Sequence, residues 1–262
     1  WPQVPQLITC HDFTPLRQSN SRKAWLRYRY WLPRHVRCAR RLIAISGTVA
    51  DQLVEFGAPA SDVVVIPNGI VVERQAVQSP GSEDLLVLAR HDANKNLAAL
   101  LKAMAGVQRL LPQWQGMLRI VGRESRLTPG LKQLVAQLPR PDQVQWVVSL
   151  TREELLSQLR SSLALVSAST EEGFDYPVLE AKAEGIPTLI SDIPVHREFH
   201  NSSSLFFPID DTGESLAAHI KALCSGDSTW TQLSIQGYAL AQSLSVERQQ
   251  AAILSHLEAI TA

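Results

Sequence analysis

Long hydrophobic runs are absent from this sequence of 262 residues, although 45% of its residues are hydrophobic. No apolar stretch approaches the roughly 20 residues that a helix needs to span a bilayer. The chain also opens without the charged and then apolar segment of a signal peptide. Cysteine is scarce, and Cys10, Cys38 and Cys224 show neither a disulfide framework nor the spacing of metal ligands. We therefore expect a cytoplasmic protein in a reducing environment.

An excess of either charge is absent too, since 25 Lys and Arg residues balance 25 Asp and Glu residues. Global charge therefore gives no reason to expect a nucleic-acid partner. The sequence also lacks a D-x-D pair, a motif that holds a divalent ion on a diphosphate. Asp210 and Asp211 are adjacent and precede an expected helix, so their predicted role is to cap it. No metal site is predicted.

What the sequence does contain is an alternation of short apolar runs with segments of helical period. This alternation is typical of an α/β fold with parallel sheets. The expected strands cover residues 7–10, 41–46, 63–66, 85–89, 118–121, 144–148, 163–167, 188–191 and 204–207. A turn at Pro67, Asn68 and Gly69 is followed by a polar stretch that reaches Ser82. Proline and glycine in this stretch indicate a domain boundary.

This boundary and the start of the last helix divide the chain into three expected parts. Residues 1–68 are expected to form a partial N-terminal domain, and residues 69–243 a second domain. Residues 244–262 are expected to form a C-terminal helix that packs back toward the first domain. The first expected strand, residues 7–10, is apolar enough to need neighbours on both sides. We therefore expect the N-terminal domain to be incomplete, with further sequence upstream of Trp1.

The segment from Ser169 to Glu180 carries a clear chemical pattern. It reads as the end of a strand, a loop with a glycine, and a helix with Pro177 in its first turn. Unpaired backbone N–H groups at a helix start suit a phosphate. Glu172 and Glu180 bracket that point, and carboxylates accept hydrogen bonds from hydroxyl groups. The plain alternative is a favourable first-turn charge at Glu172 and a solvated helix residue at Glu180.

The same segment resembles the E-x7-E signature of the retaining family 4 glycosyltransferases, which have the GT-B fold of two Rossmann-like domains. The pattern runs from Glu172 to Glu180 and continues through Gly185 and Pro187. Further matches follow the family's order along the chain, and they are Ile66-Pro67-Asn68-Gly69, the Arg90-x4-Lys95 pair and Val121-Gly122. The resemblance covers nearly the whole chain, and it implies a GT-B enzyme that uses a nucleotide diphosphate sugar.

The resemblance also implies roles for individual residues. Glu172 would contact hydroxyls of the transferred sugar, and Glu180 would bind the ribose hydroxyls. Arg90 and Lys95 would neutralise the diphosphate, because fixed cations stabilise the charge that builds up there in the transition state. The residues whose backbone would cradle the donor are Gly173, Phe174, Val178 and Leu179. Glu172, Arg90 and Lys95 are thus predicted to be catalytic, and solvated loop charges are the alternative for the two cations.

Two more segments match the family. The pair His11 and Asp12 resembles its H-D loop, whose histidine faces the donor sugar, so His11 is predicted to be catalytic as well. A structural histidine and a turn-capping aspartate are the alternatives. The loop of residues 148–151, which includes Leu150, resembles the one whose backbone contacts the nucleobase. Backbone contacts leave little trace in side chains, so guanine and uracil both stay open.

One local concentration of positive charge lies between Arg17 and Arg41, where no acidic residue occurs. The basic residues inside it are Arg22, Lys23, Arg27, Arg29, Arg34, Arg37 and Arg40. They are interleaved with aromatic residues, a mixture that suits an anionic membrane surface, where lipid-linked acceptors reside. We expect peripheral contact with the inner face of the cytoplasmic membrane. A solvated helix beside the acceptor cleft is the alternative.

These features predict a metal-independent retaining glycosyltransferase. It would move a hexose from a GDP- or UDP-sugar to a glycan or lipid-linked acceptor in polysaccharide or glycolipid synthesis, with no separate cofactor. Two alternatives are a catalytically silent sugar-nucleotide-binding subunit and a nucleotide-sugar epimerase of the GT-B type. The intact set of Glu172, Glu180, Arg90 and Lys95 favours donor chemistry.

Overall fold

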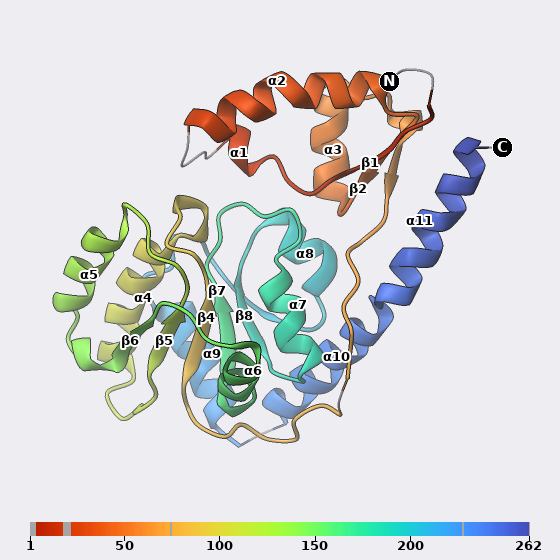
Figure 1. Cartoon of the computed structure of the whole chain (residues 1–262). Coiled ribbons are helices and arrows are strands. Elements are labelled where there is room, and N and C mark those ends of the chain that lie inside the picture. Colours follow the sequence, from red (N-terminus) through yellow and green to blue (C-terminus); the bar gives the residue numbers. More distant parts are fainter. Residues whose placement is uncertain (1–3, 18–21, 74, 227, 262) are drawn as a thin grey trace. The chain divides into compact units, whose positions relative to one another are not determined.

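The computed structural model describes residues 4–17, 22–73, 75–226 and 228–261, and Figure 1 labels its elements. The chain divides into two compact units. The first contains the residues up to Val71, the short segment Glu171–Asp175 and the C-terminal residues from Leu244. The second contains Val72–Thr170 and Tyr176–Ser243. Residues 18–21 of the basic segment lie outside the described residues.

The first unit is built on a parallel sheet with the order β1-β2-β3. Its strands are β1 (Leu7–Cys10), β2 (Arg41–Ala44) and β3 (Val63–Val65). Its helices are α1 (Thr14–Arg17), α2 (Arg22–Cys38), α3 (Gly47–Glu55), η1 (Ala60–Asp62) and α11 (Val246–Thr261). The strand expected at residues 41–46 ends earlier, because the Ser46 side chain accepts a hydrogen bond from the Val49 backbone N–H at 3.1 Å and caps α3.

The second unit is built on a six-stranded parallel sheet with the order β6-β5-β4-β7-β8-β9. Its strands are β4 (Leu85–Leu88), β5 (Leu118–Val121), β6 (Val144–Val147), β7 (Ala164–Ser167), β8 (Thr188–Ser191) and β9 (Leu205–Phe207). Strand β4 is continuously apolar, as expected for a strand covered on both faces of the sheet, and Leu85, Leu165 and Leu189 of β4, β7 and β8 are fully buried. The predicted α/β class with parallel sheets is confirmed.

Helices flank this sheet in Figure 1. They are α4 (Leu97–Leu110), α5 (Thr128–Ala136), α6 (Arg152–Ser161), α7 (Tyr176–Ala183), α8 (Pro194–His200), α9 (Glu214–Cys224) and α10 (Thr229–Ser243), with short 3₁₀ turns η2 (Ala93–Lys95) and η3 (Pro141–Gln143). Helix α4 packs beside α5 and α9, and α7 packs beside α10. Within the described ranges, no helix combines the length and the apolar character that a membrane crossing requires.

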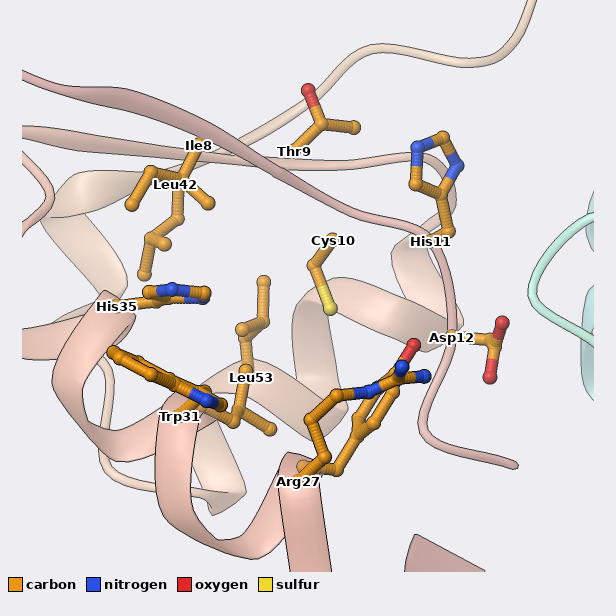
Figure 2. A pocket seen from close by; sticks show the side chains of 12 residues that line it. Ile8, Thr9, Cys10, His11, Asp12, Arg27, Trp31, His35, Leu42 and Leu53 are labelled. Atoms are coloured by element: carbon orange, nitrogen blue, oxygen red, sulfur yellow. The ribbon is translucent and has the colours of Figure 1, made fainter. Parts of the chain in front are cut away.

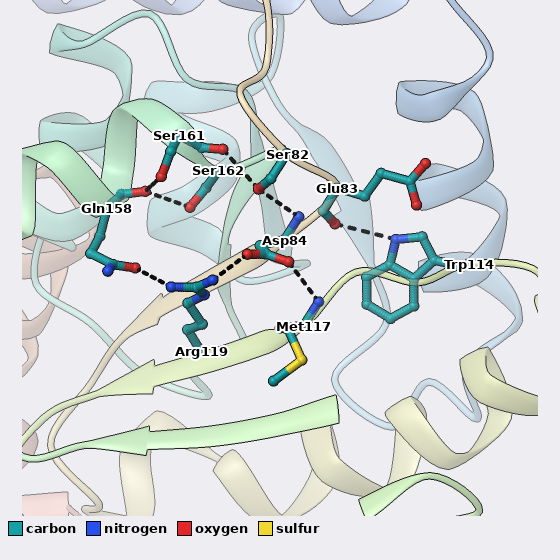
Figure 3. Close-up of polar contacts among 9 residues, drawn as sticks. All are labelled: Ser82, Glu83, Asp84, Trp114, Met117, Arg119, Gln158, Ser161 and Ser162. Carbon is teal, nitrogen blue, oxygen red and sulfur yellow. Dashed lines mark hydrogen bonds and ion pairs between the residues drawn. The ribbon is translucent and has the colours of Figure 1, made fainter. Parts of the chain in front are cut away.

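A polar network ties together the amino ends of the central strands (Figure 3). Arg119 on β5 donates to one carboxylate oxygen of Asp84 at 2.7 Å, and the other oxygen accepts from the Met117 backbone N–H at 2.8 Å. The Ser82 hydroxyl donates to the Ser161 carbonyl at 2.8 Å. These contacts join the segments that lead into β4, β5 and β7. The Asp84 carboxylate at the amino edge of the sheet is therefore satisfied by partners within the protein.

Candidate functional site

The strand order of the second unit places a switch point between β4 and β7. From β4 the chain proceeds to β5 and β6 on one side, and then crosses over to β7, β8 and β9 on the other. In open parallel sheets, ligands bind outside the carboxyl ends of the strands at such a point. Arg90 and Lys95 follow β4, and Glu180 lies on the helix after β7. The structure therefore brings three predicted donor-binding residues to the elements that flank the switch point.

The loop after β4 carries both predicted cations. The Arg90 side chain is 72% exposed, and its guanidinium lies 3.2 Å from the Asp92 carboxylate. Lys95 ends the turn η2, and α4 begins after Asn96, which adopts a left-handed conformation with φ of 50°. Asparagine tolerates this conformation better than most residues do. The left-handed turn at Asn96 thus explains why α4 starts directly after this residue.

The buried side chain of His91 anchors the same loop, which the sequence did not indicate. Its side chain is 2% exposed, and Nδ1 forms a hydrogen bond of 2.9 Å with the Thr128 hydroxyl. The His91 ring also meets Trp146 edge-on, with ring centroids 4.9 Å apart. Burial is the largest influence on this imidazole and lowers its pKa. A neutral, fixed His91 therefore supports the backbone between Arg90 and Asp92.

The carboxyl ends of β4 and β5 approach each other closely at Gly122. A Cβ atom at this position would lie 1.9 Å from the Ala89 carbonyl oxygen, which is far inside any real contact distance. Only glycine lets the loop after β5 run this close to the residue before Arg90. The glycine of the Val121-Gly122 match is thus required by close packing against the loop that carries the two cations.

The loop after β6 leads into α6 through a capping box. The Thr151 hydroxyl accepts a hydrogen bond from the Glu154 backbone N–H at 3.2 Å, and the Glu154 carboxylate accepts one from the Thr151 N–H at 2.7 Å. The helix start predicted at Thr151 is confirmed. Leu150 is partly buried against the hydrophobic core. Its side chain is therefore engaged in packing, which leaves its backbone as the group that could face a nucleobase.

The loop after β7 leads into α7 through a strained residue. Asp175 has a φ of 64°, in the left-handed region, and it is buried. Phe174 is buried as well, whereas Glu172 is partly exposed. On α7, Val178 and Leu179 are fully buried, so only their backbone could reach a ligand. This fits the backbone cradle that the resemblance implies.

Glu180 is a partly buried carboxylate that makes no hydrogen bond or ion pair with the described residues. Burial raises its pKa, and the positive charge of Arg152 at the start of α6 partly opposes that rise. A half-buried acceptor without a protein partner retains its capacity to accept hydrogen bonds from a ligand. The sequence did not indicate that Arg152 influences the pKa of Glu180, because the two residues come near each other only in the fold.

The first unit holds His11 directly after β1, with an exposed side chain. Asp12 accepts a hydrogen bond from the Thr14 backbone N–H at 3.0 Å, so it caps the following turn. Both residues line a cavity of about 310 Å³. They lie at one end of it, and Trp31 and His35 of α2 lie at the other (Figure 2). His11 thus borders a hollow whose opposite end is aromatic.

Glu171 is a further acidic residue of the first unit that the sequence pattern did not single out. Burial raises its pKa, and Arg17 opposes that rise. The Arg17 guanidinium lies 3.6 Å from one of its carboxylate oxygens. Glu171, the residue before Glu172, is therefore paired with Arg17 within the first unit. Nowhere in the described part of the chain do three or more His, Cys, Asp or Glu residues form a group that could hold a metal ion.

Comparison with known proteins agrees with this architecture. Residues 72–239 match the model of the glycosyl transferases group 1 family, and residues 1–74 match that of glycosyltransferase family 4. A structure of Anabaena Alr3699/HepE in complex with UDP and glucose is similar over 98% of this chain and 72% of its own, with a TM-score of 0.79 and 19% identity. A crystal structure of TarM is similar over 98% of this chain and 50% of its own, with a TM-score of 0.77 and 14% identity. Both likenesses concern the fold, which is GT-B.

Two curated relatives act in glycan or lipid-linked synthesis by name. The O-antigen chain mannosyltransferase RfbU of Salmonella typhimurium is 26% identical over 79% of this chain and 57% of its own. The GDP-mannose:cellobiosyl-diphosphopolyprenol alpha-mannosyltransferase of Xanthomonas oryzae is 34% identical over 59% of this chain and 40% of its own. The chain thus spans about half the length of these relatives. Because the group 1 model matches most of the chain, the protein belongs to the glycosyl transferases group 1 family.

Proposed function

We propose that the chain is the donor-binding part of a retaining glycosyltransferase that takes a hexose from a nucleotide diphosphate sugar. The observation that carries the proposal is Glu180, a half-buried carboxylate without a hydrogen-bond partner among the described residues. Glu180 lies on α7, the helix that follows β7. Strand β7 is the neighbour of β4, and Arg90 and Lys95 follow β4. A carboxylate for ribose hydroxyls beside two cations for a diphosphate matches the two chemical ends of a nucleotide.

The transfer step places its main electrostatic demand on the leaving group. The bond between the anomeric carbon and the diphosphate oxygen breaks, and its electron pair stays with the diphosphate. An acceptor hydroxyl forms the new bond to the anomeric carbon, and its proton goes to the departing diphosphate. Arg90, Lys95 and the backbone N–H groups at the start of α7 would stabilise that charge without a metal ion. Glu172 and His11 would hold the sugar hydroxyls, and the anomeric configuration would be retained.

The acceptor side of the proposal is a glycan or lipid-linked glycan, supported by the names of the curated relatives. Helix α2 supports a lipid-linked acceptor in particular. Its large apolar side chains Trp25, Leu26, Tyr30 and Trp31 are exposed among basic residues, and Leu32 alone of its described side chains is buried. Exposed aromatic and basic side chains on one helix suit the interface of an anionic bilayer. We include peripheral contact of α2 with such a membrane in the proposal.

The donor reaction is tested by incubating the protein with a panel of GDP- and UDP-sugars and measuring release of nucleoside diphosphate, with and without lipid-linked glycan acceptors. Release that depends on an acceptor supports transfer, and proton NMR of the product reports whether the anomeric configuration is kept. Binding of the donor without release would instead identify a silent sugar-nucleotide-binding subunit. Conversion of the donor to an isomer would identify an epimerase.

Membrane contact is tested by flotation with vesicles of pure phosphatidylcholine or with added phosphatidylglycerol. We expect flotation only with the anionic vesicles, and loss of it in the variant Leu26→Ser/Tyr30→Ser. Val54→Ser on α3 is a matched control, because Val54 is another exposed apolar side chain of the first unit. Equal flotation with both vesicle types, or in both variants, would contradict a role for α2.

A further inference from the structure

Helix α7 carries a lysine that has no access to solvent. Lys182 lies in the last turn of the helix, two residues after Glu180, and it is fully buried. Its Nζ donates to the backbone carbonyl of Ser203, to the Ser203 hydroxyl at 2.9 Å and to the Ser204 hydroxyl at 2.9 Å. Three oxygen acceptors thus match the three donors of a lysine ammonium. The side chain is fully used inside the protein.

None of these partners carries a negative charge. Burial lowers the pKa of Lys182 to about 7, and no carboxylate contributes to that shift. A buried cation without a counter-charge lowers stability, and an apolar side chain of similar length would fill the same space at lower cost. What the lysine provides, and a methionine would not, is a directed connection between segments. We therefore expect Lys182 to fix the relative positions of these segments rather than to raise the stability of the fold.

The connection reaches three segments that are distant in sequence. Ser203 and Ser204 precede β9, and the Ser204 hydroxyl also forms a hydrogen bond of 2.6 Å with the Thr188 hydroxyl at the start of β8. On the other side, Gly237 of α10 packs against the aliphatic stem, since a Cβ there would lie 3.0 Å from Lys182 Cγ. The lysine is thus held between α10 and the segments that lead into β8 and β9.

Helix α7 is short enough for this anchor to set its direction. It spans eight residues, about two turns. A tether at its last turn therefore limits rotation and sliding of the whole helix, including the turn that presents Glu180. The Glu180 carboxylate has no hydrogen bond of its own to the described residues, so its place depends on the helix that carries it.

We propose that Lys182 is a positioning residue that holds α7 in the orientation in which Glu180 receives the ribose hydroxyls of the donor. The proposal rests on the nucleotide-sugar donor proposed above. It assigns a function in donor binding to a side chain that is out of reach of any ligand. The effect passes through Glu180, which makes it separable from a general loss of stability.

The experiment measures the Kd for GDP and UDP by isothermal titration calorimetry, at a temperature at which every variant is folded by circular dichroism. Lys182→Met should raise the Kd for the preferred nucleotide about fivefold in the wild-type background. In the Glu180→Ala background the same change should add less than about 1.5-fold, because coupled residues are not additive. A full fivefold effect in both backgrounds would overturn positioning through Glu180.

Arg119→Met serves as the matched control. It removes another partly buried cation of the second unit, at the amino edge of the sheet (Figure 3). We expect it to lower the melting temperature and to leave the Kd unchanged. If the Kd rose equally in both variants, Lys182 would be only structural.

The variant Ser203→Ala/Ser204→Ala provides a second path should Lys182→Met fail to fold. It keeps the lysine and removes two of its three acceptors, so it should raise the Kd in the same direction. An unchanged Kd in this variant would overturn the proposal. The wild type separates this failure from that of the proposed function: nucleotide binding by the wild type with no effect of either variant defeats the positioning role alone. No binding of either nucleotide by the wild type would overturn both.

Discussion

The two edges of the six-stranded sheet use polar side chains in opposite ways. At the amino edge, the Asp84 carboxylate is filled by Arg119 and the Met117 N–H, so both of its oxygens have partners inside the protein. At the carboxyl edge, Arg90 pairs with Asp92 at 3.2 Å but is still 72% exposed, and the Glu180 carboxylate has no hydrogen-bond partner among the described residues. Polar groups that satisfy each other stabilise a fold, whereas groups left available can bind a ligand. The comparison separates charges that are satisfied within the protein from charges that we propose bind the donor.

The largest expected effect is that of Glu172→Gln, in the loop after β7. The amide keeps the shape of the side chain but loses the charged acceptor for sugar hydroxyls. We expect the turnover number to fall at least about 100-fold, a loss of about 3 kcal/mol of transition-state stabilisation. Affinity for free nucleoside diphosphate should stay within about threefold. The two readouts are nucleotide release and calorimetry, and a matching loss of affinity would show that Glu172 contacts the nucleotide instead.

The two cations of the β4 loop should come next in size. Arg90→Ala and Lys95→Ala should each weaken nucleoside diphosphate binding about 20-fold, because charge-assisted hydrogen bonds contribute about 2 kcal/mol each. The double variant should lose less than the sum of the single losses, since both act on one diphosphate. Titration calorimetry of the three variants checks this. Unchanged affinity in all of them would make Arg90 and Lys95 solvated loop charges.

On the amino side the expected effect is on stability. Asp84→Asn removes the charge that pairs with Arg119, so the free energy of unfolding should fall by about 1 to 2 kcal/mol in urea titrations. The Kd for nucleoside diphosphate should not change. Glu83→Gln is the matched control, because Glu83 is exposed and contributes only its backbone carbonyl to Trp114. A changed Kd in Asp84→Asn would break the separation of the two edges.

Lys182 gives a pH-dependent test of an internal charge beside the amino ends of β8 and β9. Its pKa is lowered to about 7 in the folded protein, from 10.5. Between these values the unfolded chain binds the extra proton, so the free energy of unfolding should rise with pH. From pH 7 to 8.5 the wild type should gain about 1 to 2 kcal/mol relative to Lys182→Met, and titration of the cysteines cancels in this difference because both proteins contain them. Parallel pH curves for the two proteins, in chemical denaturation followed by circular dichroism, would contradict the lowered pKa.

The smallest expected effect concerns metal ions. If Arg90, Lys95 and the start of α7 carry the leaving-group charge, transfer should persist in excess EDTA and change less than about twofold with Mg²⁺ or Mn²⁺. The measurement is initial rate at constant ionic strength. Loss of transfer in EDTA with recovery on adding a divalent ion would contradict the metal-free mechanism and direct attention to Asp175 and Asp192.

The periodic part of the fold could be predicted from sequence, because each strand and helix leaves a local pattern. The strand expected at residues 85–89 is found at Leu85–Leu88, and the cap expected at Thr151 is confirmed. The apolar run predicts Ser46 as the end of a strand, because the sequence does not reveal that the serine side chain caps α3. Local chemistry decides such boundaries to within one or two residues.

The candidate site divides in the same way. The loops that carry Arg90, Glu172 and Glu180 could be read from motifs, and their roles in donor binding stay predictions. Lys182 could not be found, because its environment comes from residues about 20 and 55 positions away in the chain. In sequence it is one more charge at helical spacing. Only the packing of α7 against distant segments reveals that it is buried.

The close approach at Gly122 limits how the proposed donor site can diversify in sequence. A side chain there would push apart the ends of β4 and β5, and the loop with Arg90 and Lys95 would shift with them. Directed evolution of donor preference must therefore draw its variation from positions beyond this glycine. Arg123 and Glu124 follow it directly and are exposed, so they can be randomised while the backbone beside the cations keeps its course. Gly122 must therefore stay a glycine, whereas the exposed positions that follow it can be substituted.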